Sequence, residues 1–311
     1  MSEVEVFLIA GRPALQLRRL RNSGPPVLYV HGATFPSALS FGYRFVDGRS
    51  WEDDLHSRGF DAWSFDFAGF GGSERMDASS TSLSDSRAKS AAEQISRVVD
   101  YIREQRDGEP VNLIAHSWGS IAAGCYLNHC AHSFGRLVFF GPIAQRQGSS
   151  TANVDALPAT RLITVEAQLA RFIADLPNGN PPVLEEPDLR LWGPAYLSSD
   201  PVALTRNPPS VEVPGGPAAD IAAAWQGELG YDPASIKLPT LVIRGEWDSL
   251  CNDQDAGFLL RRLGSEQKCD VVIPKATHLM HLEMGRFALW EATAAFLQKQ
   301  NPPAAFIDQQ I

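Results

Sequence analysis

Ser117 is the residue best placed to act as a nucleophile. It lies in LIAHSWGSIAAG, where an apolar segment ends at Ala115 and a helix rich in small residues is expected to begin after the serine. A serine on a tight turn between a strand and a helix stands clear of the sheet, and the next backbone N–H and the helix terminus face developing negative charge. The pattern predicts attack by Ser117 on a carbonyl group, with the backbone N–H of Trp118 donating to the oxyanion.

Two later segments supply a base and its partner. LVIRGEWDSL is an apolar strand that ends in an acid, Asp248, and DVVIPKATHLMHLE is a later strand followed by His278. A serine hydroxyl is a poor nucleophile until a base accepts its proton. We therefore expect His278 to take the proton of Ser117 and return one to the leaving group, while Asp248 orients the histidine. The chemistry predicted is acyl transfer.

Other residues compete for these roles. His281 shares the short segment HLMHLE with His278, but it comes second after the strand, so His281 and Glu283 are expected to anchor the following helix. Glu246 could replace Asp248 only if its strand ended two residues sooner.

Two histidines close to the expected site have structural interpretations. His116 precedes the nucleophile and is expected to be a packed neighbour. His31 is expected to hydrogen-bond the backbone and shape the loop that follows it.

Alternating strands and helices must position these residues. Six short apolar runs have strand length, and several are apolar throughout, as strands buried on both faces are. The expected strands are 27–30, 60–67, 111–115, 136–140, 240–244 and 269–273, and the expected helices are 51–58, 83–105, 119–129, 255–263 and 285–299. This alternation predicts right-handed crossovers and a doubly wound, mostly parallel α/β sheet.

The alternation stops between about residues 148 and 239. This stretch is rich in proline and glycine, as in PNGNPP, RNPPS and VPGGP. Apolar residues at 162, 165, 169, 172 and 173 recur at helical spacing, and 220–225 forms a second short helical pattern. We predict a core domain of residues 1–145 and 235–311, with a mainly helical cap inserted at residues 146–234.

These motifs resemble the α/β-hydrolase superfamily. Strand, serine and helix resemble its nucleophile elbow, with Ala115 where the first glycine usually stands, and Ser117, Asp248 and His278 follow the order of its catalytic residues. VLYVHGATFP and FDFAGFGGSE resemble two further loops of that family. The resemblance implies an eight-stranded sheet and a second oxyanion donor, the backbone N–H of Ala33, beside that of Trp118.

The reaction class expected is hydrolysis of a carboxylic ester or lactone through an acyl-enzyme. Haloalkane dehalogenases and epoxide hydrolases of this fold attack with aspartate, which Ser117 does not fit. Prolyl aminopeptidase-like amide cleavage, carbon–carbon bond hydrolysis and thioester hydrolysis with the same trio stay open, as does a ligand-binding role without turnover. Trp192, Tyr196 and Trp225 in the insert are candidates to line an acyl pocket, although such aromatic residues also commonly form the core of a small insert.

Composition restricts the partners. With 311 residues, 44% of them hydrophobic and 20% charged, the chain has the composition of a globular protein, and its net charge of −9 argues against nucleic acid as the main partner. No run approaches the length of a membrane span, and MSEVEVFLIA carries acidic residues where a signal peptide needs basic ones. We expect a cytoplasmic monomer or homodimer that acts on a small acyl substrate.

No cofactor or metal is expected. The glycines of AGFGGS lack dinucleotide-binding spacing, and no C-x-x-C pair occurs. Cys125 and Cys130 are expected to be free thiols.

Overall fold

An eight-stranded sheet forms the centre of the molecule. The computed structural model describes residues 3–76, 81–130 and 134–300. The strand order is β1-β2-β4-β3-β5-β6-β9-β10. The strands are β1 Glu5–Ile9, β2 Leu15–Leu20, β3 Pro26–Val30, β4 Asp61–Phe65, β5 Val111–His116, β6 Phe134–Phe140, β9 Thr240–Gly245 and β10 Lys268–Ile273. Only β2 runs antiparallel to its neighbours β1 and β4 among these strands, so the predicted mostly parallel, eight-stranded sheet is confirmed.

The central strands are covered on both faces. Every residue of β3, β4, β5 and β9 is buried, which explains why these segments are apolar nearly throughout. All six predicted strands are present. The sequence did not predict β1 and β2. Less exposed and more exposed residues alternate along most of each strand, so their apolar signal is weaker.

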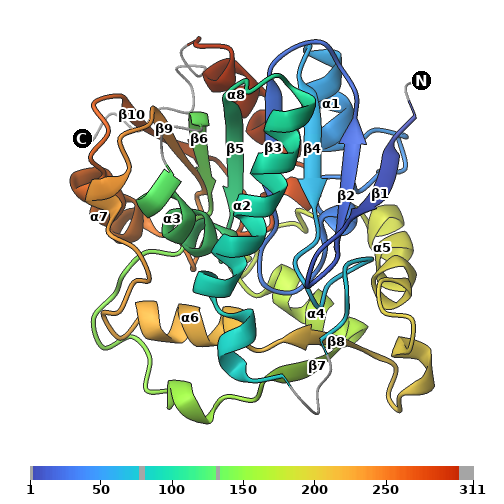
Figure 1. Cartoon of the computed structure of the whole chain (residues 1–311). Helices are drawn as coiled ribbons and strands as arrows, with labels where there is room; N and C mark the ends of the chain where they lie inside the picture. The colour runs from blue at the N-terminus through green and yellow to red at the C-terminus, as the bar shows by residue number, and fades with distance from the viewer. Residues whose placement is uncertain (1–2, 77–80, 131–133, 301–311) are drawn as a thin grey trace.

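Helices lie on both faces of the sheet. Figure 1 shows α2 and α3 in front of the sheet, and α1 and α8 behind it. The helices outside the insert are α1 Trp51–Ser57, α2 Ala88–Gln105, α3 Gly119–Cys130, α7 Asp253–Arg262 and α8 Arg286–Leu297. This is the layering expected of a doubly wound fold.

One predicted helix is interrupted. The sequence predicted a continuous helix over 83–105, but a 3-10 turn at Leu83–Ser86 is followed by an extended Arg87 before α2 begins. The carboxylate of Asp220 accepts hydrogen bonds from the Arg87 side chain (2.7 Å) and from the backbone N–H of Ala88 (2.7 Å). This carboxylate at the helix N-terminus favours a start at Ala88.

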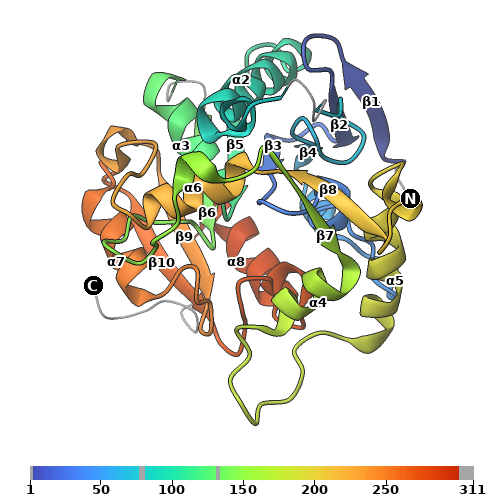
Figure 2. The same cartoon turned by 90° about the horizontal axis from the view of Figure 1, so that it is seen from below.

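The insert is the segment 141–239 between β6 and β9. It contains α4 Val165–Ile173, α5 Glu186–Ser198, α6 Gly216–Ala224 and a two-stranded antiparallel sheet of β7 Thr160–Thr164 and β8 Ser210–Pro214. Figure 2 shows α4, α6, β7 and β8 together on the side viewed from below. The insert is mainly helical, but its small sheet was not predicted.

The predicted helical pattern in the insert began too early. Leu162 was counted with the apolar positions of a helix, but it lies in β7 and is 60% exposed. The helix begins only at Val165, because the side chain of Thr164 accepts a hydrogen bond from the backbone N–H of Ala167 and so caps α4.

Membrane-spanning helices and cysteine pairing can be checked in the described residues. None of the helices within them is long and apolar enough to cross a membrane. Cys125, Cys251 and Cys269 carry free thiols, whereas the side chain of Cys130 lies outside the described part of the structure.

Candidate active site

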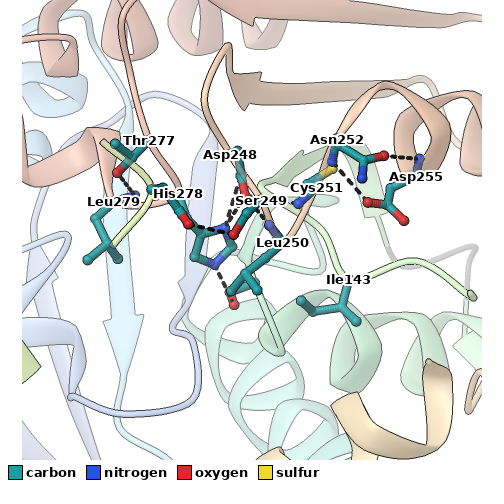
Figure 3. A network of polar contacts seen from close by, with 12 residues as sticks. Ile143, Asp248, Ser249, Leu250, Cys251, Asn252, Asp255, Thr277, His278 and Leu279 are labelled. Atoms are coloured by element: carbon teal, nitrogen blue, oxygen red, sulfur yellow. Dashed lines mark hydrogen bonds and ion pairs between the residues drawn. The ribbon is translucent and has the colours of Figure 1, made fainter. Parts of the chain in front are cut away.

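Three side chains meet beyond the carboxyl ends of the parallel strands. Ser117 follows β5, Asp248 follows β9 and His278 follows β10. The Nε2 of His278 lies 2.8 Å from the Oγ of Ser117, and its Nδ1 lies 2.9 and 3.0 Å from the two carboxylate oxygens of Asp248. Figure 3 shows Asp248 and His278 facing one another. The structure thus brings together the three predicted residues, although Ser117 and His278 lie 161 positions apart in the sequence.

The backbone at Ser117 has a strained conformation. Its φ is 55°, in the left-handed region that a residue with a side chain rarely adopts. Its N–H donates to the carbonyl of Phe140 at 2.9 Å. Gly119 permits the turn, because a Cβ there would lie 2.5 Å from the carbonyl oxygen of His31. Strain of this kind is commonly held at functional sites by the surrounding structure.

Asp248 is fixed by its own loop. Its Oδ1 accepts hydrogen bonds from the backbone N–H groups of Leu250 and Cys251, both at 2.9 Å, and Figure 3 shows these contacts beside the histidine. The carboxylate therefore presents its oxygens to His278 without needing to reorganise. Glu246, the weaker candidate, accepts instead from the backbone N–H of Lys275 on the neighbouring loop.

Glu283 holds the segment that carries His278. One oxygen of Glu283 accepts from the backbone N–H of Thr277 at 3.0 Å, and the other accepts a hydrogen bond from the Thr277 hydroxyl. The carboxyl group is fully buried, and burial raises the pKa of Glu283 to about 7. The sequence prediction that Glu283 anchors the following helix missed this contact, because the residue reaches back across the turn rather than forward.

His281 also differs from the prediction. Its ring is buried and stacks against Phe35, with further contacts to His116 and Phe140, and neither ring nitrogen has a hydrogen-bond partner within the described residues. Burial, and to a lesser degree the charge of His278, lowers the pKa of His281 to about 3. It is a neutral packing residue and not an anchor of α8.

The loop after β3 carries the second expected oxyanion donor. The backbone N–H groups of Ala33 and Trp118 have no hydrogen-bond acceptor within the described part of the chain. His31 shapes this loop as expected: its Nε2 accepts from the N–H of Phe67 at 3.0 Å, so its Nδ1 carries the proton donated to the carbonyl of Gly32 at 2.8 Å. The predicted packing of His116 is also observed, since its ring stacks on that of Phe140 with centroids 4.2 Å apart.

A cavity of about 290 Å³ opens onto Ser117 and His278. Its walls come from the loop after β3, from the elbow and from the insert. The lining residues include Ala33, Phe35, Ser150, Arg161, Gln168, Arg171, Ile221, Ala222, Trp225, Leu250 and Leu279. A mostly apolar cavity with a few polar groups is the usual form of a small-molecule site.

The three aromatic candidates have different places. Trp225 lines the cavity. Trp192 and Tyr196 do not: their rings stack with centroids 5.0 Å apart, and Trp192 also packs edge-on against Phe172. These two residues therefore form part of the core of the insert, which is the alternative that the sequence left open.

The elbow also contacts the insert directly. The indole N–H of Trp118 donates to the carboxylate of Asp220 on α6 at 2.9 Å. The same carboxylate accepts hydrogen bonds from the Arg87 side chain and from the backbone N–H of Ala88 at the start of α2. No pattern in the sequence predicts the contact between Trp118 and Asp220, because it joins residues 102 positions apart.

The comparisons with known proteins place the chain in a family. A family model described as serine aminopeptidase, S33, matches residues 50–285. The chain belongs to this family. The serine aminopeptidase S33 family consists of α/β-hydrolases, so the resemblance noted in the motifs is confirmed at the level of the family.

Solved structures agree on the fold. The chain resembles a thioesterase domain from the curacin biosynthetic pathway, with a TM-score of 0.66 and 16% identity over 96% of this chain and 100% of that one. It also resembles the esterase EaEST from Exiguobacterium antarcticum, with a TM-score of 0.65 and 19% identity over 96% of this chain and 100% of that one. The epoxide hydrolase VrEH1 from Vigna radiata is similar as well, with a TM-score of 0.65 and 17% identity over 96% of this chain and 99% of that one. A comparison with curated proteins gave no match. At these identities the structures establish the fold, and the activity must be argued from the site.

Proposed function

We propose that this chain is a serine hydrolase that cleaves a carboxylic ester or lactone through an acyl-enzyme. The observation that carries the proposal is the continuous hydrogen-bonded chain from Ser117 through His278 to Asp248. Membership of a hydrolase family supports it.

The reaction follows from the geometry. His278 accepts the Ser117 proton on Nε2 as Oγ attacks the substrate carbonyl, and the imidazolium is stabilised by Asp248. The oxyanion receives hydrogen bonds from the free N–H groups of Ala33 and Trp118. His278 then protonates the departing oxygen. In the second half, His278 takes a proton from water, the resulting hydroxide attacks the acyl-enzyme, and Ser117 leaves with its proton restored.

The first test is covalent labelling of Ser117. Intact mass spectrometry after incubation with a fluorophosphonate is expected to show one adduct on the wild type and none on Ser117→Ala. Turnover of 4-nitrophenyl esters of increasing chain length should be lost in the same variant, with at least a ~10³-fold fall in kcat. A Ser117→Ala protein with full activity would contradict the mechanism, and an unlabelled wild type that turns over no ester would remove the proposal.

Aminopeptidase activity is a second candidate, because the matching family model carries that description. An amino terminus is normally held by a carboxylate, yet the described lining of the cavity contains arginines and no aspartate or glutamate. We therefore favour the ester. Faster hydrolysis of aminoacyl 4-nitroanilides than of neutral 4-nitrophenyl esters would reverse this choice.

A further inference from the structure

Arg161 is an arginine directed toward the proposed active site. It lies in β7, where successive side chains point to opposite faces. Its neighbour Leu162 is 60% exposed, so Arg161 faces the other way, and it lines the cavity that contains Ser117 and His278.

The guanidinium of Arg161 has no partner. Within the described residues it forms no hydrogen bond or ion pair, and its Nε is fully buried without an acceptor. Burial lowers the pKa of this group, and the side chain that acts on its charge is the phenol of Tyr196, not a carboxylate. The residue as a whole is of intermediate burial, and a positive charge that is partly removed from water without a counterion is costly.

Other arginines of the insert are neutralised within the protein. Arg171 pairs with Asp175 at 3.2 Å, and Arg206 pairs with Asp200 at 2.7 Å. Arg190 pairs with Glu186 at 2.6 Å on the surface. Among these arginines, Arg161 is the one without an ion pair in the described part of the chain, and it lines the cavity from β7.

Gln168 supplies a second free polar group. It lies on α4, only 3% exposed, and lines the same cavity. No hydrogen bond is formed by its amide within the described part of the chain. A buried amide of this kind normally has a partner, so it is available to a ligand.

We propose that Arg161 and Gln168 form a carboxylate-binding subsite, and that the substrate is an ester carrying a free carboxylate away from the bond that is cleaved. This inference rests on the proposed esterase function. One unpaired guanidinium matches one negative charge and can hold a carboxylate by two parallel hydrogen bonds, which the amide of Gln168 supplements. The apolar walls formed by Phe35, Ile221 and Trp225 fit the hydrocarbon chain between the two ends.

The test compares matched charged and neutral esters. One pair places the charge on the acyl group: 4-nitrophenyl hydrogen glutarate against 4-nitrophenyl valerate. The other places it on the leaving group: 4-carboxyphenyl valerate against phenyl valerate. The wild type is expected to favour the charged member of one pair in kcat/KM, and Arg161→Gln should reduce that preference about 10- to 100-fold. Arg161→Lys, which keeps the charge, should restore part of it.

Arg190→Gln is the matched control. It also removes one positive charge from the insert, but at a surface site paired with Glu186, so the ratio of charged to neutral ester should stay near that of the wild type. A wild type that prefers neither charged ester, or an Arg190→Gln protein that loses the preference as fully as Arg161→Gln, would overturn the subsite.

Binding separates this inference from the proposed function. Monomethyl glutarate is titrated calorimetrically into Ser117→Ala and into Ser117→Ala combined with Arg161→Gln. Binding that is lost with Arg161, in a protein whose wild type turns over no ester, would keep the subsite and remove the esterase. Absence of binding to Ser117→Ala, with ester turnover intact in the wild type, would remove the subsite alone.

Discussion

Gly141 lies against the two residues that support the proposed nucleophile. Its φ is 49°, and a Cβ at this position would stand 3.0 Å from Nδ1 of His278 and 3.1 Å from Oδ2 of Asp248. The glycine follows β6, so this strand contributes space where β5, β9 and β10 contribute side chains. Room at one residue therefore decides whether the hydrogen bond between His278 and Asp248 can form.

Replacing Gly141 by alanine is expected to impair catalysis more than folding. The added methyl group displaces His278 or Asp248, and a displacement on the order of 1 Å costs about 100-fold in rate. We expect kcat on a 4-nitrophenyl ester to fall by at least this factor. The matched control is Gly148→Ala, also at positive φ (65°) but with no atom within 4 Å of the added Cβ. Equal losses in both variants would show that backbone strain, not crowding of the pair, is responsible.

At the scale of elements, the turn between β10 and α8 is held by a buried carboxyl group. Glu283 binds both the N–H and the hydroxyl of Thr277, the residue before His278. Thr277 in turn accepts from the N–H of Leu279 at 3.2 Å, so both neighbours of the histidine are fixed. Figure 3 shows Thr277 and Leu279 next to the histidine.

The buried Glu283 predicts a particular pH dependence of stability. Its pKa is about 7 in the folded chain against an ordinary value of 4.5, so between these values the folded state holds a proton that the unfolded state has released. The free energy of unfolding therefore falls as pH rises from about 4.5 to 7, by roughly 3 kcal/mol at most. Urea unfolding at pH 5 and pH 8 should show this loss in the wild type and a smaller one in Glu283→Gln. The same loss in both proteins would contradict the assignment.

At the scale of the whole molecule, the sheet and the insert are joined through the elbow. Asp220 of α6 accepts hydrogen bonds from the side chains of Trp118 and Arg87 and from the backbone N–H at the start of α2. One carboxylate therefore links the insert to the elbow and to α2. Burial raises its pKa, while the hydrogen bonds from Trp118 and Arg87 act in the opposite direction. The wall of the cavity formed by α6 is thereby fixed relative to Ser117.

The buried histidines predict that acid destabilises the whole fold. Burial lowers the pKa of His31, His116 and His281, so below about pH 6.5 the unfolded chain takes up protons that the folded chain excludes. Stability is lost as pH falls. His281→Phe suits the aromatic surroundings and should remove roughly 2 to 3 kcal/mol of this loss at pH 4.5. Tryptophan fluorescence during acid titration of the wild type and of His281→Phe measures this loss of stability.

The control for the acid titration is His56→Gln. His56 is only partly buried, and its Nε2 lies 3.1 Å from the carbonyl of Arg21. We expect this variant to unfold in acid as the wild type does. If His281→Phe lowers the acid midpoint no more than His56→Gln, burial of His281 is not a source of the acid sensitivity.

The amino-acid sequence was enough to predict the parallel sheet and the three residues that meet beyond it. Buried strands require continuous apolar runs, and a serine, an acid and a histidine at the ends of such runs must gather at one edge, because parallel strands end there together. These signals are local. The antiparallel strands β1 and β2 carry a weaker apolar signal, and so do β7 and β8, which pair although α4 and α5 lie between them in the chain.

The surroundings of these three residues could be read only from the folded chain. The contacts of Glu283 with Thr277 and of Trp118 with Asp220, the space at Gly141 and the free charge of Arg161 depend on side chains from distant segments. The same dependence separates Trp225 in the cavity from Trp192 in the core of the insert, although both are tryptophans in one proline-rich stretch. Whether a polar or aromatic side chain is satisfied within the protein or left to a ligand is a property of its neighbours in space, which sequence spacing does not encode.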